Sequence, residues 1–500
     1  GGISKQLGGV IETVELQIGE TFAHNRTPLP FQVGEHALIV SKGVLGVNDG
    51  FIAFEGVASE EDSLRTKLEF TNITLTPLVQ LLPDSLPLQG TVNGEINYVE
   101  SQGRQNIRTD FTITDAAYNG LDYASVDVVT RYSQNLLSIT NIVLTSHEDG
   151  EIRITGEIPW DLESMLNRNR LELDPGTSIR ADVQFDSVQL GKYSSYIPMD
   201  QPMAGLVTGQ SSLRGIWAAP VASADLIVLQ PRFDRITGDS LSVKASYDSG
   251  ELQFAHLFLD EGAPGNIYTG EGTLPLYMNF ADGIVRLNRD QEMDLHFRGE
   301  SDHLQFLEQY LGDVDAITGE FVVSLDVVGT PNNPVRNGAL VARNGQIEVS
   351  TLENEITHVN TVARLQNNTM TISSFSARMH EERESEIIEG TFNRIKKWFS
   401  QLFNRELPAK GDNITVTGTL DFQKFFEPGL DLTVNGDRVY IRSLLSEVEG
   451  VVDADLTLTG RDSLIIEGDI DPEEMVLRMD FSGEETPREP SDGGGRYVEY

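Results

Sequence analysis

The chain has 500 residues, of which 39% are hydrophobic and 8% aromatic, so it can bury a core and is not a disordered acidic tail. Its 77 acidic and 37 basic residues give a formal net charge of −40, which repels phosphate backbones, so we expect no nucleic-acid partner. The absence of cysteine excludes disulfides, iron–sulfur clusters and thiolate zinc sites.

Apolar and polar residues alternate along most of the chain, which predicts β-strands with one apolar and one polar face. The clearest run is 412–422, where alternate residues from Ile414 to Phe422 are apolar or glycine. The same alternation occurs at 152–158, 241–247, 321–327 and 464–470. The predicted fold class is all-β, and alternation alone fits either a β-sandwich or a long curled sheet with one apolar surface.

Pairs that tolerate positive φ punctuate these runs and predict tight hairpins between antiparallel neighbours. Asn-Gly occurs at 93–94, 119–120, 337–338, 344–345 and 435–436, and Asp-Gly at 49–50, 149–150 and 282–283.

Two short phrases recur and predict tandem units. An opening phrase stands at 92–95, 207–210 and 317–320, and a closing phrase at 155–158, 271–274 and 417–420. The opening-to-closing glycine gap lengthens in the third copy, which indicates an insertion there. The predicted segments are strands in 1–89, groove repeats at 90–204, 205–316 and 317–429 with a helical insertion at about 380–410, and further strands in 430–500.

Helical spacing is confined to a few places. The stretches 75–83 and 303–311 each predict a short helix that covers part of the sheet, whereas 193–202 is a poorer match. The insertion predicts an amphipathic helix at 392–405, which either touches a membrane or plugs the open end of the sheet. Its apolar stripe is Phe392, Ile395, Trp398, Phe399, Leu402 and Phe403, and its cations are Arg394, Lys396, Lys397 and Arg405.

Recognisable catalytic chemistry is missing from the sequence. The eight histidines form no metal-ligand pair at helical spacing, and neither a Gly-x-Ser-x-Gly elbow nor a phosphate-binding loop occurs. We therefore expect a protein that is not an enzyme, with no catalytic residues, metal site or cofactor.

Three stretches resemble the TamB/AsmA-like superfamily: 75–98, 319–345 and 430–481. The resemblance implies a long curled β-sheet groove, or β-taco, that spans the periplasm of a diderm bacterium and carries phospholipids between the inner and outer membranes. It also implies an N-terminal inner-membrane anchor and a terminal segment that meets an outer-membrane β-barrel partner, and we expect both to lie outside this sequence. By an older proposal, the family assists the assembly and secretion of autotransporters and other outer-membrane proteins.

A groove of this kind would need one continuous apolar face, since each methylene kept from water is worth about 0.8 kcal/mol. The residues expected to line it are Ile152, Ile154, Ile158, Phe321, Val323, Leu325, Val327, Ile414, Val416, Leu420, Phe422, Leu464 and Ile466. Two alternatives remain at this point: a scaffold whose sheet edges template barrel proteins, and an extracellular β-sandwich adhesin array. The direction in which the apolar faces point distinguishes a groove from a sandwich.

Overall fold

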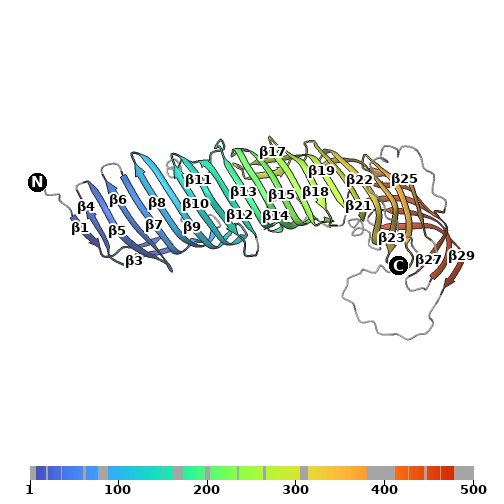
Figure 1. The fold of residues 1–500 in the computed structure, drawn as a ribbon, viewed down its shortest axis with the longest axis horizontal. Helices are drawn as coiled ribbons and strands as arrows, with labels where there is room; N and C mark the ends of the chain where they lie inside the picture. Colours follow the sequence, from blue (N-terminus) through green and yellow to red (C-terminus); the bar gives the residue numbers. More distant parts are fainter. Residues whose placement is uncertain are drawn as a thin grey trace, which may run out of the picture. The chain divides into compact units, whose positions relative to one another are not determined.

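Almost all of the chain that the structure describes is β-strand, as the alternation predicts. The computed structural model describes residues 7–18, 21–34, 36–59, 63–76, 88–148, 150–161, 173–197, 203–233, 236–262, 266–303, 314–379, 411–425, 427–443, 448–461 and 463–477. Its 29 strands form one long antiparallel sheet (Figure 1), so the predicted all-β sheet fold is confirmed.

The chain divides into two compact units, and the first comprises Gly1–Ser301 with Val322–Gly338. Its strands are β1 (Leu7–Ile11), β2 (Glu15–Ile18), β3 (Thr21–Asn25), β4 (Leu29–Val33), β5 (Ala37–Val47), β6 (Gly50–Ser59), β7 (Ser63–Thr74), β8 (Leu88–Ser101), β9 (Arg104–Tyr118), β10 (Leu121–Ser133), β11 (Leu136–Thr145), β12 (Glu151–Pro159), β13 (Arg180–Gln189), β14 (Met203–Ile216), β15 (Ala219–Phe233), β16 (Ile236–Thr237), β17 (Ser240–Asp248), β18 (Glu251–Asp260), β19 (Ile267–Asn279), β20 (Ile284–Leu287) and β21 (Met293–His303).

The second unit comprises Asp302–Phe321 with Ala339–Tyr500. The strands β22 (Val314–Thr330) and β23 (Asn333–Val349) contribute residues to both units, as does β21 through its last two residues. The remaining strands belong to the second unit: β24 (Ile356–Gln366), β25 (Thr369–Arg378), β26 (Ile414–Asp421), β27 (Gly429–Arg442), β28 (Val448–Gly460) and β29 (Leu464–Leu477).

Consecutive strands are mostly antiparallel neighbours, as the hairpin signals predict. From β5 to β15 each strand pairs with the next, and the same holds from β24 to β29. Two short strands are bypassed, because β15 also pairs with β17, and β19 pairs with β21 as well as β20. Near the start of the chain the order is less regular, with β1 against β4 and β3 against β5.

The Asn-Gly pairs predicted as turns mostly lie inside strands, and the prediction is wrong for four of them. Asn119 and Gly120 do form the turn between β9 and β10, with φ of 49° and 85°. The pairs at 93–94, 337–338, 344–345 and 435–436 lie instead within β8, β23 and β27. Positive φ at Gly94 and Asn344 shows that these residues bend a continuing strand rather than reverse the chain.

The opening phrase of the predicted repeat has a structural role in β8 and β14. The residue just before the glycine of this phrase is Asn93 in β8 and Thr208 in β14. Its side chain accepts a hydrogen bond from the backbone N–H of a bulged residue on the preceding strand. The bulged residues, Asn72 and Ser187, have φ of 54°. Each cap therefore satisfies a donor that the bulge removes from the ladder.

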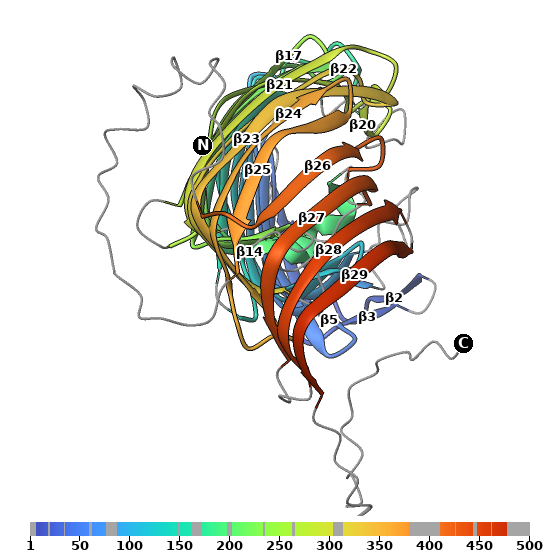
Figure 2. The ribbon, with the colours of Figure 1, turned by 90° about the vertical axis from the view of Figure 1, so that its right-hand side faces the viewer.

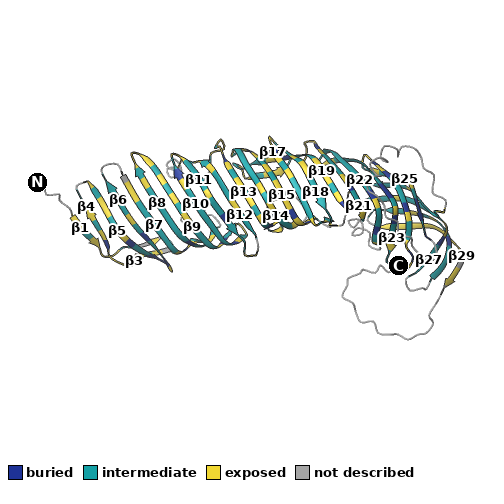
Figure 3. Cartoon of the chain, in the orientation of Figure 1, coloured by how far each residue is buried: buried dark blue, intermediate teal, exposed yellow. Residues whose placement is uncertain are grey.

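Buried side chains gather in several small clusters. The first unit contains one around Ile73 and Val92 and another around Val188, Val207 and Val228. The second unit contains one around Ile317 and Phe321 and another around Val439 and Val452. Elsewhere the strands alternate between partly buried and exposed residues (Figure 3), as expected of a sheet with one face toward water.

One helix is longer than a single turn among the described residues: the 3₁₀ helix η1 (Leu190–Tyr196) between β13 and β14. This helix overlaps 193–202, the stretch whose sequence matches the predicted short helices least well. The predicted helices at 75–83 and 303–311 lie almost wholly outside the described residues, although Leu75 packs on the Ile73 cluster. The predicted insertion at 380–410 and its helix at 392–405 also lie outside them.

Candidate functional site

A continuous row of directly paired residues crosses the first unit on one face of the sheet. Cross-strand partners in an antiparallel pair point to the same side, so a succession of partners traces one face. We call the following set the central row, and only Ser211 in it has a polar side chain: Leu45, Ile52, Phe70, Gly94, Phe111, Val128, Ile142, Ile154, Val183, Ser211, Ala224, Ala245, Phe254, Gly272 and Leu295.

A second row runs beside the central row and contains no polar side chain. We call it the flanking row: Ile73, Val92, Ile113, Val126, Leu144, Ile152, Phe185, Gly209, Leu226, Val243, Leu257, Gly270 and Phe297. The two rows together make an apolar face that passes unbroken from β7 to β21. Neither row contains a charged residue.

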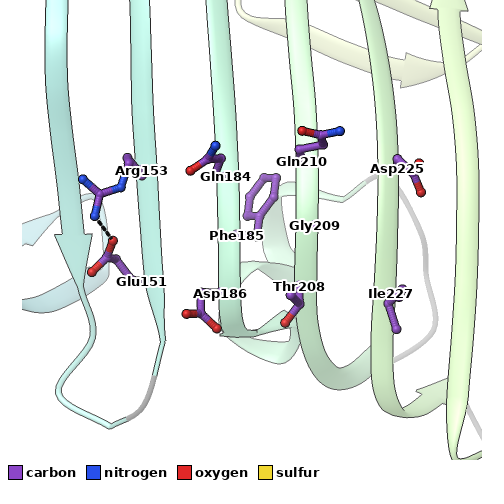
Figure 4. Close-up of a pocket in the computed structure, with 10 residues that line it drawn as sticks. All are labelled: Glu151, Arg153, Gln184, Phe185, Asp186, Thr208, Gly209, Gln210, Asp225 and Ile227. Atoms are coloured by element: carbon purple, nitrogen blue, oxygen red, sulfur yellow. Dashed lines mark hydrogen bonds and ion pairs between the residues drawn. The ribbon is translucent and has the colours of Figure 1, made fainter.

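The opposite face of the same strands is polar. Its registered partners are Asn93, Thr112, Asp127, Val143, Arg153, Gln184, Gln210, Asp225, Lys244 and His256. Figure 4 shows part of this row, with Arg153, Gln184, Gln210 and Asp225 in line across successive strands. A shallow depression here is lined mainly by these polar side chains, so it does not extend the apolar face.

Ion pairs organise the polar face near β7 and β8. Lys67 Nζ lies 2.8 Å from Glu69 Oε1 and 2.9 Å from Glu95 Oε2. These hydrogen bonds raise the pKa of Lys67 and lower the pKa of both carboxyl groups. All three residues therefore remain charged near neutral pH and keep this face in water.

The width of the apolar face suits a hydrocarbon chain. On β12 it includes Ile152, Ile154, Gly156 and Ile158, whose alternate positions span roughly 20 Å at about 3.4 Å per residue. One leaflet of a bilayer has a hydrocarbon depth of about 15 Å, half of the roughly 30 Å core. The three isoleucines are only partly buried, so their side chains remain accessible for contact.

Two hydroxyl groups lie beside the two rows on the apolar side of the sheet and bond to each other. Thr109 and Thr130 are direct partners on β9 and β10, and their Oγ1 atoms lie 2.6 Å apart in a hydrogen bond. At the margin of this region, Tyr98 Oη donates to Glu100 at 2.7 Å. Burial and this bond raise the pKa of Tyr98 to about 12, so it stays a neutral phenol.

The second unit repeats the two-faced arrangement. One apolar row is Ala363, Ile372, Gly418, Leu432, Leu458 and Ile466, and another is Leu365, Met370, Leu420, Leu430, Gly460 and Leu464. The intervening positions are polar, as in the partners Thr417, Thr433, Thr457 and Glu467. Each unit thus carries its own apolar face.

Most of the residues expected to line a groove belong to these faces. Ile152, Ile154 and Ile158 lie in the first unit, whereas Ile414, Val416, Leu420, Leu464 and Ile466 are registered in the second. Val323, Leu325 and Val327 alternate along β22, and Phe321 is buried in its own cluster. Phe422 lies just beyond β26, with its ring centroid 6.0 Å from that of Phe425.

The helix η1 covers one margin of the apolar face. Figure 2 shows it, in green near β14, on the concave side of the strands. Leu190 and Tyr193 pack against the Val188–Val207–Val228 cluster, whose members are 6–7% exposed. Three side chains tie η1 to the β9–β10 turn, some 70 residues earlier: Tyr193 Oη bonds Tyr123 Oη at 3.1 Å, Lys192 pairs with Asp122 at 3.4 Å, and Tyr196 bonds Asn119.

A short hairpin covers the other margin. Past Pro275 the end of β19 leaves the main sheet, pairs with β20 and crosses the ends of β14 to β18. The N–H of Met278 donates to Tyr247 Oη at 3.0 Å, and the N–H of Phe280 donates to the carbonyl of Trp217 at 3.1 Å. Tyr247 beneath the hairpin and Leu276 at its start are both buried, at 4% and 8% exposure.

Neither cover was predicted from the sequence. The tyrosines of η1, Tyr193 and Tyr196, are three residues apart, but a single such pair is too short a pattern to predict a helix. The β19–β20 hairpin looks like any other pair of strands. An aromatic pair meets at each cover, Tyr123 with Tyr193 and Trp217 with Phe280, but the two members of each pair are more than 60 residues apart in the chain.

Comparison with known proteins adds no relative. No protein-family model matches the chain, and no curated protein is significantly similar to it in sequence. In the part of the chain that the structure describes, no helix is long and apolar enough to cross a membrane. Among the same residues, no group of three or more histidine or acidic side chains is arranged to hold a metal ion.

Proposed function

We propose that this protein binds the acyl chains of phospholipids along its apolar face and carries them between the inner and outer membranes of a diderm bacterium. The observation that carries the proposal is the unbroken pair of rows from β7 to β21, with a polar face behind them. The periplasmic location, the inner-membrane anchor and the outer-membrane β-barrel partner are parts of the same proposal and rest on the resemblance to TamB/AsmA-like proteins.

The energetics favour a lipid on such a face. Each methylene moved from water to apolar surroundings gains about 0.8 kcal/mol, so a chain needs apolar contact along its whole route. Partly buried isoleucine, valine and phenylalanine side chains offer this contact, and the absence of charge in the rows avoids stranding an ion under hydrocarbon. A conduit rather than a closed cavity suits a ligand that travels.

The test compares adjacent residues on the two faces of one strand. Ile154→Asp places a charge in the central row, and Thr155→Asp places the same charge on the polar face of β12. We expect at least a fivefold loss of co-purified phospholipid in I154D and wild-type content in T155D, measured by mass spectrometry of the extracted lipid.

A second pair of variants repeats the comparison in the other unit. Val416→Asp and Thr417→Asp differ in the same way on β26. Circular dichroism would check that each variant keeps its sheet. Equal lipid content in folded variants of both faces would contradict the proposal, as would wild-type protein without lipid.

A scaffold for outer-membrane barrel proteins is the second candidate, and strand β29 favours it. Leu464, Ile466 and Ile470 are 54–58% exposed on this strand, which pairs only with β28 among the described strands. Such an edge can accept an incoming strand. If this is the function, Ile466→Lys abolishes capture of an unfolded barrel protein in a pull-down and leaves phospholipid content unchanged.

A further inference from the structure

The two covers on the apolar face of the first unit lie at opposite margins of neighbouring strands. The helix η1 packs over Val188, Val207 and Val228, on β13 to β15. The β19–β20 hairpin lies over Tyr247 and beside the β14–β15 turn. Both margins of the face are therefore occluded at β13 to β17, and central-row residues between them, such as Val183 and Ala224, stay partly exposed.

Both covers are weak elements on a strong sheet. A 3₁₀ helix has poorer hydrogen-bond geometry than an α-helix, and η1 has no side-chain N-cap and no fully buried residue. The hairpin is a ribbon of four residue pairs, from Leu276–Leu287 to Asn279–Ile284, and two-stranded ribbons are marginal in isolation. Segments that open at low free energy have this character.

The contacts that hold η1 to the β9–β10 turn are polar, and the Asp122 carboxylate among them is accessible. Lys192 reaches both the carbonyl and the carboxylate of Asp122, and its ammonium lies 5.2 Å from the centre of the Tyr123 ring. The Asp122 side chain is 63% exposed, so water and ions can compete for the pair. Release of these contacts would free η1 from the β9–β10 turn while the strands beneath it remain paired.

We propose that η1 and the β19–β20 hairpin form a gate on the apolar face, and that η1 must leave the β9–β10 turn for a lipid head group to pass. The inference rests on the proposed lipid function. Acyl chains lie between the covers on the central row, whereas a polar head group is wider and needs the margin that η1 closes. The gate makes passage along the face stepwise.

A cross-link tests the gate, and the absence of native cysteine makes the labelling specific. The variant Asp122→Cys with Lys192→Cys is joined by a short bis-maleimide, which locks η1 to the turn. The protein is loaded with head-group-fluorescent phosphatidylethanolamine, and transfer to phosphatidylcholine vesicles is followed by fluorescence. We expect the locked protein to transfer at least fivefold more slowly than the same variant treated with N-ethylmaleimide.

A matched control places the same cross-link away from the gate. Arg153→Cys and Gln184→Cys are direct partners on the polar face, and we expect their bis-maleimide product to transfer at the unlinked rate. The opposite change, Lys192→Gln with Tyr193→Phe, should speed transfer and increase amide hydrogen exchange in 190–196.

The outcomes are distinct. Equal transfer by the locked and N-ethylmaleimide-treated proteins overturns the gate while leaving lipid carriage in place. Failure of every form, including wild type, to acquire the fluorescent lipid refutes the proposed function itself.

Discussion

Glycines on the apolar face make room for aromatic rings. A Cβ at Gly270 would come within 2.9 Å of the Phe297 ring, and one at Gly43 within 2.6 Å of the Phe54 ring. Each ring thus lies over the glycine opposite it on the neighbouring strand, and does not project from the apolar face. The sequence alone does not predict this role, because the aromatic partner of each glycine is on another strand.

A charged group on the polar face links β21 to β22. His296 Nδ1 lies 2.8 Å from Asp326 Oδ1, and Arg298 Nη1 lies 3.0 Å from the same oxygen. The hydrogen bond to Asp326 raises the pKa of His296, and burial only partly opposes it. Burial would raise the pKa of Asp326, but its bonds to His296 and Arg298 lower it.

The His296 link should weaken as pH rises. A raised folded-state pKa means that protonated His296 stabilises the fold fully below its unfolded pKa of about 6.5, and this contribution is lost as pH rises through the folded value. NMR titration should give a His296 midpoint above 6.5, and Asp326→Asn should lower it more than Asp294→Asn does. An unchanged midpoint in D326N would contradict the assignment.

Bulges determine how each strand keeps its apolar residues on one face. The extra residue at Asn72 or Ser187 shifts the alternation by one position, so that Phe70 is followed by Ile73 and Phe185 by Val188 on the same side. The cap from the next strand, Asn93 or Thr208, holds the bulge in place. The register of each bulged strand therefore depends on a polar side chain on the polar face of the sheet.

Removal of one cap should loosen its bulge. Thr208→Ala leaves the Ser187 N–H, bonded at 3.1 Å in the native protein, to water alone. We expect a loss of about 0.5–1.5 kcal/mol in unfolding free energy, by urea denaturation, with faster amide exchange at Ser187. Gln210→Ala, two residues along the same face of β14, is the control and should change neither quantity appreciably.

At the scale of the whole molecule, stability is distributed over several clusters. Each strand contacts its sequence neighbours and few others, and the four buried clusters are small and separate. In such an arrangement each segment's stability depends on its neighbouring segments rather than on a common core.

Unfolding should accordingly be local. Val452 and Ile73 are each 1% exposed, in different units, so Val452→Asp and Ile73→Asp each bury a charge in one cluster. Hydrogen exchange should rise in β26 to β29 for V452D with β8 to β12 protected, and the reverse for I73D. A uniform rise across both units in either variant would indicate a single cooperative fold.

Much of the sheet could be predicted from the sequence, because alternation is a local property. Ile414, Val416 and Leu420 share a face on β26 as their spacing requires. The strand-internal Asn-Gly pairs could not be told from turns, since both uses need the same backbone conformation. The covers depend on contacts such as Tyr123–Tyr193, which link residues 70 positions apart and have no local pattern.

Each of the strands β7 to β15, β17, β18, β19 and β21 contributes one residue to each apolar row, so the length of this surface and its width are encoded independently. Adding or removing one hairpin alters the reach by two strand spacings, about 10 Å, and leaves the profile met by any ligand the same. The length of this surface is therefore set by the number of hairpins, and duplication or loss of a hairpin changes it without altering the strands that remain.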